Sequence, residues 1–270
     1  MLGSMSKTEA FFFQGSRRGP PRRTSITVLG TVIKVQAQMK YLSLILDGRW
    51  SFWQYFVKLG PKLISGAAAL GHLRTWEDWV CYAGGVRPMV LYGALIWMDA
   101  LTADNWAFLR KPQRVIAVGG IKGYRTVSWT AATLPAGDPP WEFQAEVVAE
   151  VYRFRVEARN RGVCPGSAEV GWIRALAQQA LFVRWEDELG SPSAGLVAVE
   201  AVRSHLSRWV KRKCGTLTFK MTQVLTGHGC FGKYLNGIAR REVSPSRHEC
   251  GASVVTAYHT LSECAAWGLH

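Results

Sequence analysis

Four potential metal ligands lie close together near the end of the sequence. The stretch HECGASVVTAYHTLSEC holds His248, Cys250, His259 and Cys264. Thiolate and imidazole groups are the usual ligands of structural zinc, and the His-x4-Cys spacing of His259 and Cys264 fits such sites. Because zinc takes four ligands, His248 would have to fold its ring back beside Cys250, and Cys230 is a more distant alternative. These residues predict a small Cys/His tail with zinc as its candidate cofactor.

Clustered positive charge is the second feature with chemical consequences. The chain has 33 Lys and Arg against 19 Asp and Glu, which gives a net charge of +14. Such a surplus indicates a polyanionic partner, nucleic acid first and an acidic membrane surface second, with a merely soluble basic protein as the alternative. The candidate phosphate contacts are Arg17, Arg18, Arg22, Arg23, Arg208, Lys211, Arg212 and Lys213. Solvated loops and helix ends use such residues equally often, which leaves both interpretations open.

The six cysteines, the first residues and the apolar runs indicate the compartment of the protein, and the twelve tryptophans bear on its core. The cysteines are widely spread, and the first residues, MLGSMSKTEAFFFQG, lack the apolar core of a secretory signal. The longest apolar run, VLYGALIWM (90–98), is far too short to span a membrane. We therefore expect an intracellular protein with reduced thiols and no membrane partner. Tryptophan beside arginine suits base stacking, but most of these rings are expected in the core.

The hydrophobic pattern changes from strand-like to helix-like near residue 50. SITVLGTVIKV (25–35) alternates and is broken by Gly30, which predicts a hairpin, and KYLSLILD (40–47) predicts a further strand. Apolar residues at spacings of three and four predict helices afterwards. The expected helices are 51–73, interrupted near Gly60–Pro61, 76–101, kinked at Pro88, 102–118, 141–159, 167–189 and 195–213, with loops at 137–140 and 190–195.

The predicted fold class is mainly α with a small β hairpin or sheet remnant at the N-terminus. This makes an α+β chain with a helical body and a small Cys/His tail. Two or three strands do not form an independent domain. The β piece consequently looks cut from a larger sheet, and we expect the chain to start inside a longer protein.

Several stretches, taken in order, resemble the C-terminal part of a non-LTR retrotransposon polyprotein of the arthropod type that targets ribosomal DNA. The resemblance covers essentially the whole chain. It is carried by KTEAFFF (7–13), MKYLSLILDGRW (39–50), RPMVLYGALIW (87–97), RKPQRVIAVGGIKGYRTVSWTAA (110–132), LPAGDPPW (134–141), LTFKMTQVLTGHGCFGKYL (217–235) and HTLSECAAW (259–267).

The resemblance implies three regions of a reverse transcriptase. Residues 1–49 would be the palm end with a hairpin that grips the primer, and Lys40 and Tyr41 would contact nucleic acid there. Residues 50–190 would form a helical thumb-like region, and residues 191–270 a C-terminal helical and zinc-knuckle-like region.

One ligand of that zinc knuckle is missing from the sequence. The family pattern begins with Cys-x-x-Cys, which places its first cysteine at position 247, where this chain has Arg247. The resemblance therefore implies a motif of Cys250, His259 and Cys264, with His248 as a stand-in for the fourth ligand.

Paired catalytic carboxylates are also missing. Nucleotide transfer needs carboxylates that hold two divalent cations, and the resemblance places them upstream of KTE, in an aromatic-Ala-Asp-Asp turn. No such stretch occurs; the aspartates sit singly, and EDE (186–188) fits a solvated helix face. Lys7, which the resemblance places near the incoming nucleotide, is the one weak catalytic candidate, and a solvated lysine near a chain end is the preferred interpretation. Magnesium is therefore expected in the intact parent enzyme only.

The predicted function is a truncated RNA-directed DNA polymerase of a non-LTR retrotransposon, without its catalytic Asp pair and endonuclease, that keeps a nucleic-acid-binding thumb and tail. Its partners would be RNA, DNA and the remainder of the parent polyprotein. The nucleus is the expected location of the parent element, with the cytoplasm as the alternative. Enzyme activity is left open, because the fragment is expected to be inactive alone. The other hypotheses are a stand-alone nucleic-acid-binding protein with a host role and a non-functional relic.

Overall fold

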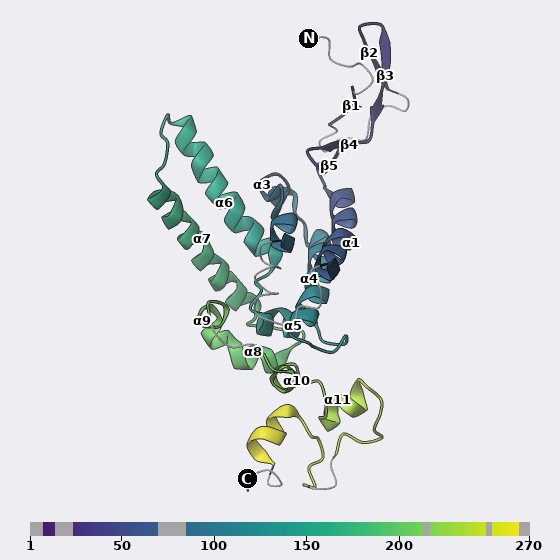
Figure 1. The fold of residues 1–270 in the computed structure, drawn as a ribbon, viewed down its shortest axis with the longest axis vertical. Helices are drawn as coiled ribbons and strands as arrows, with labels where there is room; N and C mark the ends of the chain where they lie inside the picture. Colours follow the sequence, from purple (N-terminus) through teal and green to yellow (C-terminus); the bar gives the residue numbers. More distant parts are fainter. Residues whose placement is uncertain (1–7, 14–23, 70–84, 213–216, 247–249, 265–270) are drawn as a thin grey trace.

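The structure is a computed structural model that describes residues 8–13, 24–69, 85–212, 217–246 and 250–264. The molecule is elongated (Figure 1): strands lie at one end, a helical body fills the middle, and the C-terminal segment forms the opposite end. The predicted fold class, mainly α with a small N-terminal β piece, is confirmed. In the described part of the chain, no helix is both long enough and apolar enough to cross a bilayer.

Two small sheets form the N-terminal end. The first contains β1 (Ala10–Phe11), β2 (Ser25–Val28) and β3 (Thr31–Gln36), in the order β1-β3-β2, with β1 parallel and β2 antiparallel to β3. The second pairs β4 (Gln38–Tyr41) with β5 (Leu44–Asp47) in antiparallel register.

Both hairpins turn through two residues with positive φ. Leu29 and Gly30 have φ of 46° and 79°, so the hairpin predicted at Gly30 is confirmed. Leu42 and Ser43 have φ of 43° and 68° and split 40–47, expected from its pattern to be one strand, into β4 and β5. The primer-grip resemblance had implied this hairpin, whereas the apolar pattern alone could not locate a turn that lacks glycine.

The helical body is divided into more elements than the pattern predicted. Its elements are α1 (Trp53–Ala69), a helical segment at 85–91, α3 (Ala94–Trp97), η2 (Met98–Ala100), α4 (Ala103–Gly120), α5 (Trp129–Ala136), α6 (Trp141–Asn160), α7 (Ser167–Glu188), α8 (Leu196–Val202), η3 (Arg203–His205), α9 (Leu206–Val210), α10 (Phe219–Thr226), α11 (Gly232–Gly237) and the π-helical turn η4 (His259–Glu263). The helices expected at 102–118, 141–159 and 167–189 match α4, α6 and α7, and both predicted loops are present.

The interruption predicted in the first helix is wrong. The helix α1 continues through Pro61, although proline removes one helical hydrogen bond. The carbonyl that loses its donor belongs to Val57, which lies on the exposed side. The buried stripe of Phe56, Leu59 and Leu63 packs into the main core and holds the helix together.

Pro88 lies within the helical segment 85–91, and the kink expected there stays a prediction, because the turn that precedes it lies outside the described residues. A break lies at Gly93, whose φ of 68° separates the helical segment 85–91 from α3. A Cβ atom at this glycine would lie 2.9 Å from the Leu44 side chain, so Gly93 lets β5 pack closely against this turn. The single helix expected at 195–213 is instead the short succession α8, η3 and α9.

Three buried clusters hold the helices together. The largest joins α1, the 85–91 segment, α3, α4 and α6 around Trp97, and the second joins α6, α7, α8 and α9 around Trp185. A third, rich in alanine, lies between α4 and α5. Trp97, Trp141 and Trp185 are fully buried, in keeping with the preference for tryptophan as core, whereas Trp172 on α7 is 64% exposed.

Candidate functional site

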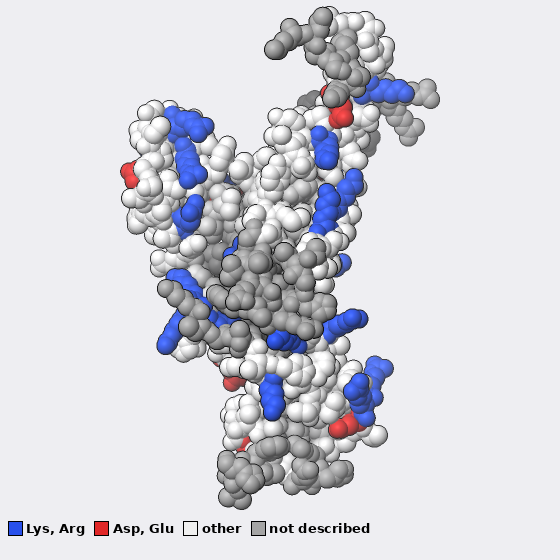
Figure 2. Space-filling view, in the orientation of Figure 1, with Lys and Arg blue, Asp and Glu red and all other residues white. Residues whose placement is uncertain are grey.

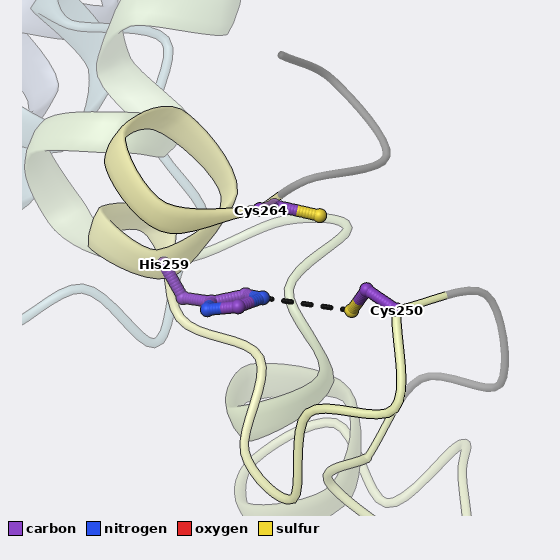
Figure 3. A group of neighbouring side chains, drawn as sticks. All are labelled: Cys250, His259 and Cys264. Atoms are coloured by element: carbon purple, nitrogen blue, oxygen red, sulfur yellow. Dashed lines mark hydrogen bonds between the residues drawn. The ribbon is translucent and has the colours of Figure 1, made fainter.

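The structure brings three of the four predicted metal ligands together. The Cys250 and Cys264 sulfurs and a His259 ring nitrogen all lie within 4.8 Å of one another (Figure 3). The π-helical turn η4 makes this possible, because the Cys264 N–H donates to the His259 carbonyl at 2.8 Å and so stacks residues five apart in the chain. Cys264 is buried and Cys250 half-buried, which gives the group one closed and one open side.

Hydrogen bonds orient the imidazole of this cluster. The His259 Nδ1 atom lies 3.3 Å from a Glu263 carboxylate oxygen, and Nε2 lies 3.5 Å from the Cys250 sulfur. A carboxylate on one ring nitrogen that directs the other toward a metal is a common arrangement around ligating histidines. The backbone N–H of Ala252 and then the His259 side chain lower the pKa of Cys250, and the thiol of Cys250 and then Glu263 raise the pKa of His259. The lowered pKa of Cys250 favours the thiolate that a metal requires, whereas the raised pKa of His259 favours the imidazolium, which must lose its proton before it can bind a metal.

A fourth protein ligand does not appear within the described part of the chain. No other histidine, cysteine or carboxylate there joins the three ligands. Cys230, the distant alternative, is exposed and is not part of the group. His248 and Arg247 lie outside the described residues. These three groups could hold a metal ion, and a four-coordinate ion would need one further donor.

The predicted phosphate contacts near the end of α9 differ in exposure and in the groups they contact. Arg208 and Lys211 are exposed at the end of α9, and the Lys211 ammonium lies 5.4 Å from the centre of the Phe182 ring. Arg212 is half-buried: its guanidinium donates to the carbonyls of Trp209 and Pro135 at 2.7 and 3.0 Å. Burial lowers the pKa of Arg212.

Two further residues of the nucleic-acid prediction lie far from these. Lys40 and Tyr41 are exposed on β4, at the strand end of the molecule, opposite the Cys/His cluster (Figure 1). The remaining predicted residues, Lys7, Arg17, Arg18, Arg22, Arg23 and Lys213, lie outside the described part. On the face in Figure 2, Lys and Arg side chains lie over α1 on one side of the molecule and over the α6–α7 hairpin on the other.

A buried ion network that the sequence did not predict ties three helices together. The Arg110 guanidinium bonds Glu142 at 2.6 Å and Glu188 at 2.7 Å, and it lies 4.3 Å from the centre of the Trp129 ring. Glu142 is 1% exposed, and desolvation raises its pKa although Arg110 opposes the shift. Of EDE (186–188), expected on a solvated face, Glu186 and Asp187 are exposed as predicted, whereas α7 turns the partly exposed Glu188 toward Arg110 on α4.

The turn GDPP is locked by a second buried polar group. Asp138 is 2% exposed and accepts hydrogen bonds from Gln113 at 2.9 Å and from Arg87 at 3.3 Å. Gln113 and Gln144 also donate to the Pro139 carbonyl, at 2.8 and 2.6 Å. This aspartate thus fixes the junction of α5 and α6. Glutamines spaced around a Gly-Asp-Pro-Pro turn are the sequence signal that could have revealed it.

Known proteins related to this chain belong to one type of mobile element. The chain is 23% identical over 278 residues to the putative 115 kDa protein in type-1 retrotransposable element R1DM of Drosophila melanogaster, a match that covers 97% of this chain and 26% of that protein. It is 24% identical over 286 residues to the retrovirus-related Pol polyprotein from type-1 retrotransposable element R1 of Bradysia coprophila, with coverage of 97% and 27%. The chain is a relative of R1 Pol polyproteins.

A third R1 relative aligns over much of its own length. The Pol polyprotein from type-1 retrotransposable element R1 4 of Nasonia vitripennis is 25% identical over 268 residues, which cover 93% of this chain and 66% of that protein. The chain spans about a quarter of the length of the Drosophila and Bradysia R1 relatives. No family model and no solved structure matches the chain. The predicted resemblance to a non-LTR retrotransposon protein is confirmed by these R1 sequences.

Proposed function

We propose that this chain is the nucleic-acid-binding thumb and C-terminal region of an R1-type reverse transcriptase. In this role it would hold RNA and DNA for a parent polyprotein that copies RNA into DNA, with the nucleus as its place of action and the cytoplasm as the alternative. The alignment with R1 Pol polyproteins over 93–97% of the chain carries this proposal. The net charge of +14 supports it, because phosphate neutralisation dominates nucleic-acid affinity.

The proposal divides the chain into three working regions. Residues 1–49 would present the primer-gripping hairpin β4–β5, with Lys40 and Tyr41 exposed on it. Residues 50–190 would be the thumb-like body, and residues 191–270 the C-terminal helical and zinc-knuckle-like region. The change from strands to helices between Asp47 and Trp53 supports the first boundary.

The C-terminal region would bind one zinc ion through Cys250, His259 and Cys264. The proximity of these three ligands supports this role. When bound, zinc would stabilise the tail, because binding energy in small metal sites is also folding energy. The fourth ligand would be His248 or a water molecule.

Catalysis would depend on a part of the parent enzyme other than the described residues. Among those residues, Cys250, His259 and Cys264 are the one group of three or more potential ligands that could hold a metal ion. Polymerase chemistry requires carboxylates that hold two divalent cations. We therefore expect this chain alone to bind nucleic acid without extending a primer.

Filter binding at two salt concentrations tests the binding function. The expected result is affinity that falls steeply with salt for both single-stranded and duplex nucleic acid, with a logarithmic slope of about −0.7 to −0.9 per phosphate contacted. Affinity that is absent, or that does not change with salt, would contradict the proposal. A primer-extension assay with magnesium completes the test, since DNA synthesis by this chain would refute the expected inactivity.

A further inference from the structure

A cavity of about 610 Å³ lies between the α6–α7 hairpin and the chain that follows α9. The GDPP turn and the helical segment 85–91 supply its remaining walls. This volume lies within the range of about 300–1,000 Å³ that is usual for pockets that bind small ligands. None of the roles proposed above uses this cavity.

The cavity combines an apolar wall with a cationic rim. The apolar wall is formed by Leu91, Val147, Val148, Leu181, Phe182 and Val210. The rim is formed by four cations from three separate segments of the chain: Arg87, Arg174, and the adjacent Lys211 and Arg212. Such a combination accommodates a ligand that is apolar at one end and anionic at the other.

Three of these cations have no carboxylate partner among the described residues. Arg87 is paired with Asp138, at 3.3 Å. Arg174, Lys211 and Arg212 form no ion pair with any carboxylate of the described chain. Exposed cations often lack a partner, but Arg212 is half-buried, and desolvating an unpaired charge is costly. A ligand anion would compensate that cost.

The guanidinium of Arg212 is held in place before any ligand arrives. It lies 4.2 Å from the centre of the Trp209 ring and donates to the carbonyls of Trp209 and Pro135. Gly137 makes room for it, since a Cβ atom there would lie 3.1 Å from Nη1 of Arg212. Because arginine has five N–H donors and two are used by carbonyls, the others are available to a phosphate.

We propose that this cavity receives one unpaired nucleotide of a bound nucleic acid. The base would lie against the aliphatic wall at Leu91 and Val147, and the phosphate would bind Lys211, Arg212 and Arg174. The amide of Gln178, which also lines the cavity, would contact the base edge. This inference rests on the proposed nucleic-acid-binding function and adds a structural preference to it: a bulged or single-stranded nucleotide, whose base is free to leave the stack, is preferred over a paired one.

Two DNA duplexes test the preference, one fully paired and one with a single unpaired 2-aminopurine. We expect wild-type protein to bind the bulged duplex about tenfold more tightly, a difference in binding free energy of about 1.4 kcal/mol. We also expect 2-aminopurine emission to rise on binding, because the base leaves its stacked neighbours. Val147→Phe, which fills the cavity from α6, should abolish both effects while the duplex still binds.

Two single-charge variants separate the cavity from general electrostatics. Lys211→Ala should weaken binding of the bulged duplex by more than that of the paired duplex. Arg161→Ala removes an exposed cation at the end of α6 that does not line the cavity, so it should weaken both equally.

The outcomes distinguish this inference from the function on which it rests. Equal affinity of wild-type protein for both duplexes, with unchanged 2-aminopurine emission, would overturn the cavity proposal and leave nucleic-acid binding intact. Binding of neither duplex at low salt would overturn both. Loss of the bulge preference in Lys211→Ala, a surface change that should leave folding intact, would support the proposal even if Val147→Phe does not fold.

Discussion

Replacing Arg110 with methionine should lower the free energy of unfolding by about 3–5 kcal/mol. This arginine is the cation that the structure pairs with Glu142, which is 1% exposed. Removing it leaves a buried carboxylate without compensation, whereas the half-exposed Glu188 can be hydrated. The replaced side chain also loses its stacking on Trp129. Urea unfolding followed by tryptophan fluorescence measures the change.

A matched surface site provides the control. Arg153 also bonds two carboxylates, Asp99 and Glu150, but its side chain is 50% exposed and theirs are 73% and 56% exposed. Exposed ion pairs contribute about 0–1 kcal/mol, so Arg153→Met should change stability by no more than about 1 kcal/mol. The comparison isolates burial, because both substitutions remove an arginine that bridges two acids.

The double variant Arg110→Met/Glu142→Leu tests the cause of the loss. With both buried charges replaced by apolar groups, stability should recover by at least about 1–2 kcal/mol relative to Arg110→Met alone. If the double variant is no more stable than the single one, or if Arg110→Met costs as little as Arg153→Met, then the reasoning from the buried carboxylate is wrong.

The pH dependence gives an independent check. Desolvation raises the pKa of Glu142 in the folded protein above that in the unfolded chain. Proton binding therefore favours the folded state: this contribution is fully present below the unfolded pKa and is lost as the pH rises through the folded pKa. Without Arg110 the pKa of Glu142 should rise further. The loss of unfolding free energy in Arg110→Met, relative to wild type, should therefore be small near pH 4 and grow toward pH 7. A deficit that does not depend on pH would contradict this.

Four further predictions follow from single positions. Gly93→Ala should destabilise the protein by about 1–2 kcal/mol or more, from its positive φ and its contact with Leu44, whereas Gly119→Ala in open space within α4 should be neutral or stabilising in the same urea titration. Gly232→Ala should disorder the tail, because its Cβ atom would lie 2.3 Å from the Pro245 carbonyl oxygen. Faster amide hydrogen exchange confined to residues 217–246 and 250–264 would show this disorder, and an unchanged exchange rate would contradict it. Cys250, whose pKa is lowered, should react with iodoacetamide at pH 7 faster than the exposed Cys164, and zinc should slow the reaction of Cys250. Mass spectrometry of the peptides that contain the two cysteines measures these rates, and equal rates would refute the thiolate assignment. Arg247→Cys should tighten zinc binding, measured by competition with a chelating dye. No gain in zinc affinity would mean that the inferred register of the motif is wrong.

Local chemistry explains what could be predicted from the sequence. The hairpin at Gly30 follows from alternation around a residue that tolerates positive φ. The helices α6 and α7 follow from long stretches with few breakers. The Cys250, His259 and Cys264 group follows from ligand type and spacing, because those residues are close in sequence as well as in space.

Tertiary packing explains what could not. The helix α5 was not predicted because all its residues from Ala131 to Ala136 are buried, so it has no polar face to produce a periodic pattern. The Arg110 network joins residues 32 and 78 positions apart, and no local rule relates them. Gly93 ends its helical segment with a positive φ, and the close approach of Leu44 to this glycine is revealed only by the assembled fold.

The exposed hairpin β2–β3 has a consequence for work with the purified chain. β2 is an outer strand of its sheet, and Ile26, Val28 and Val32 on this hairpin are 45%, 38% and 63% exposed. An outer strand that carries exposed apolar side chains is a template for edge-to-edge pairing between molecules. The isolated protein should therefore self-associate through this strand as its concentration rises, and Ile26→Lys should raise its solubility without altering the helical body.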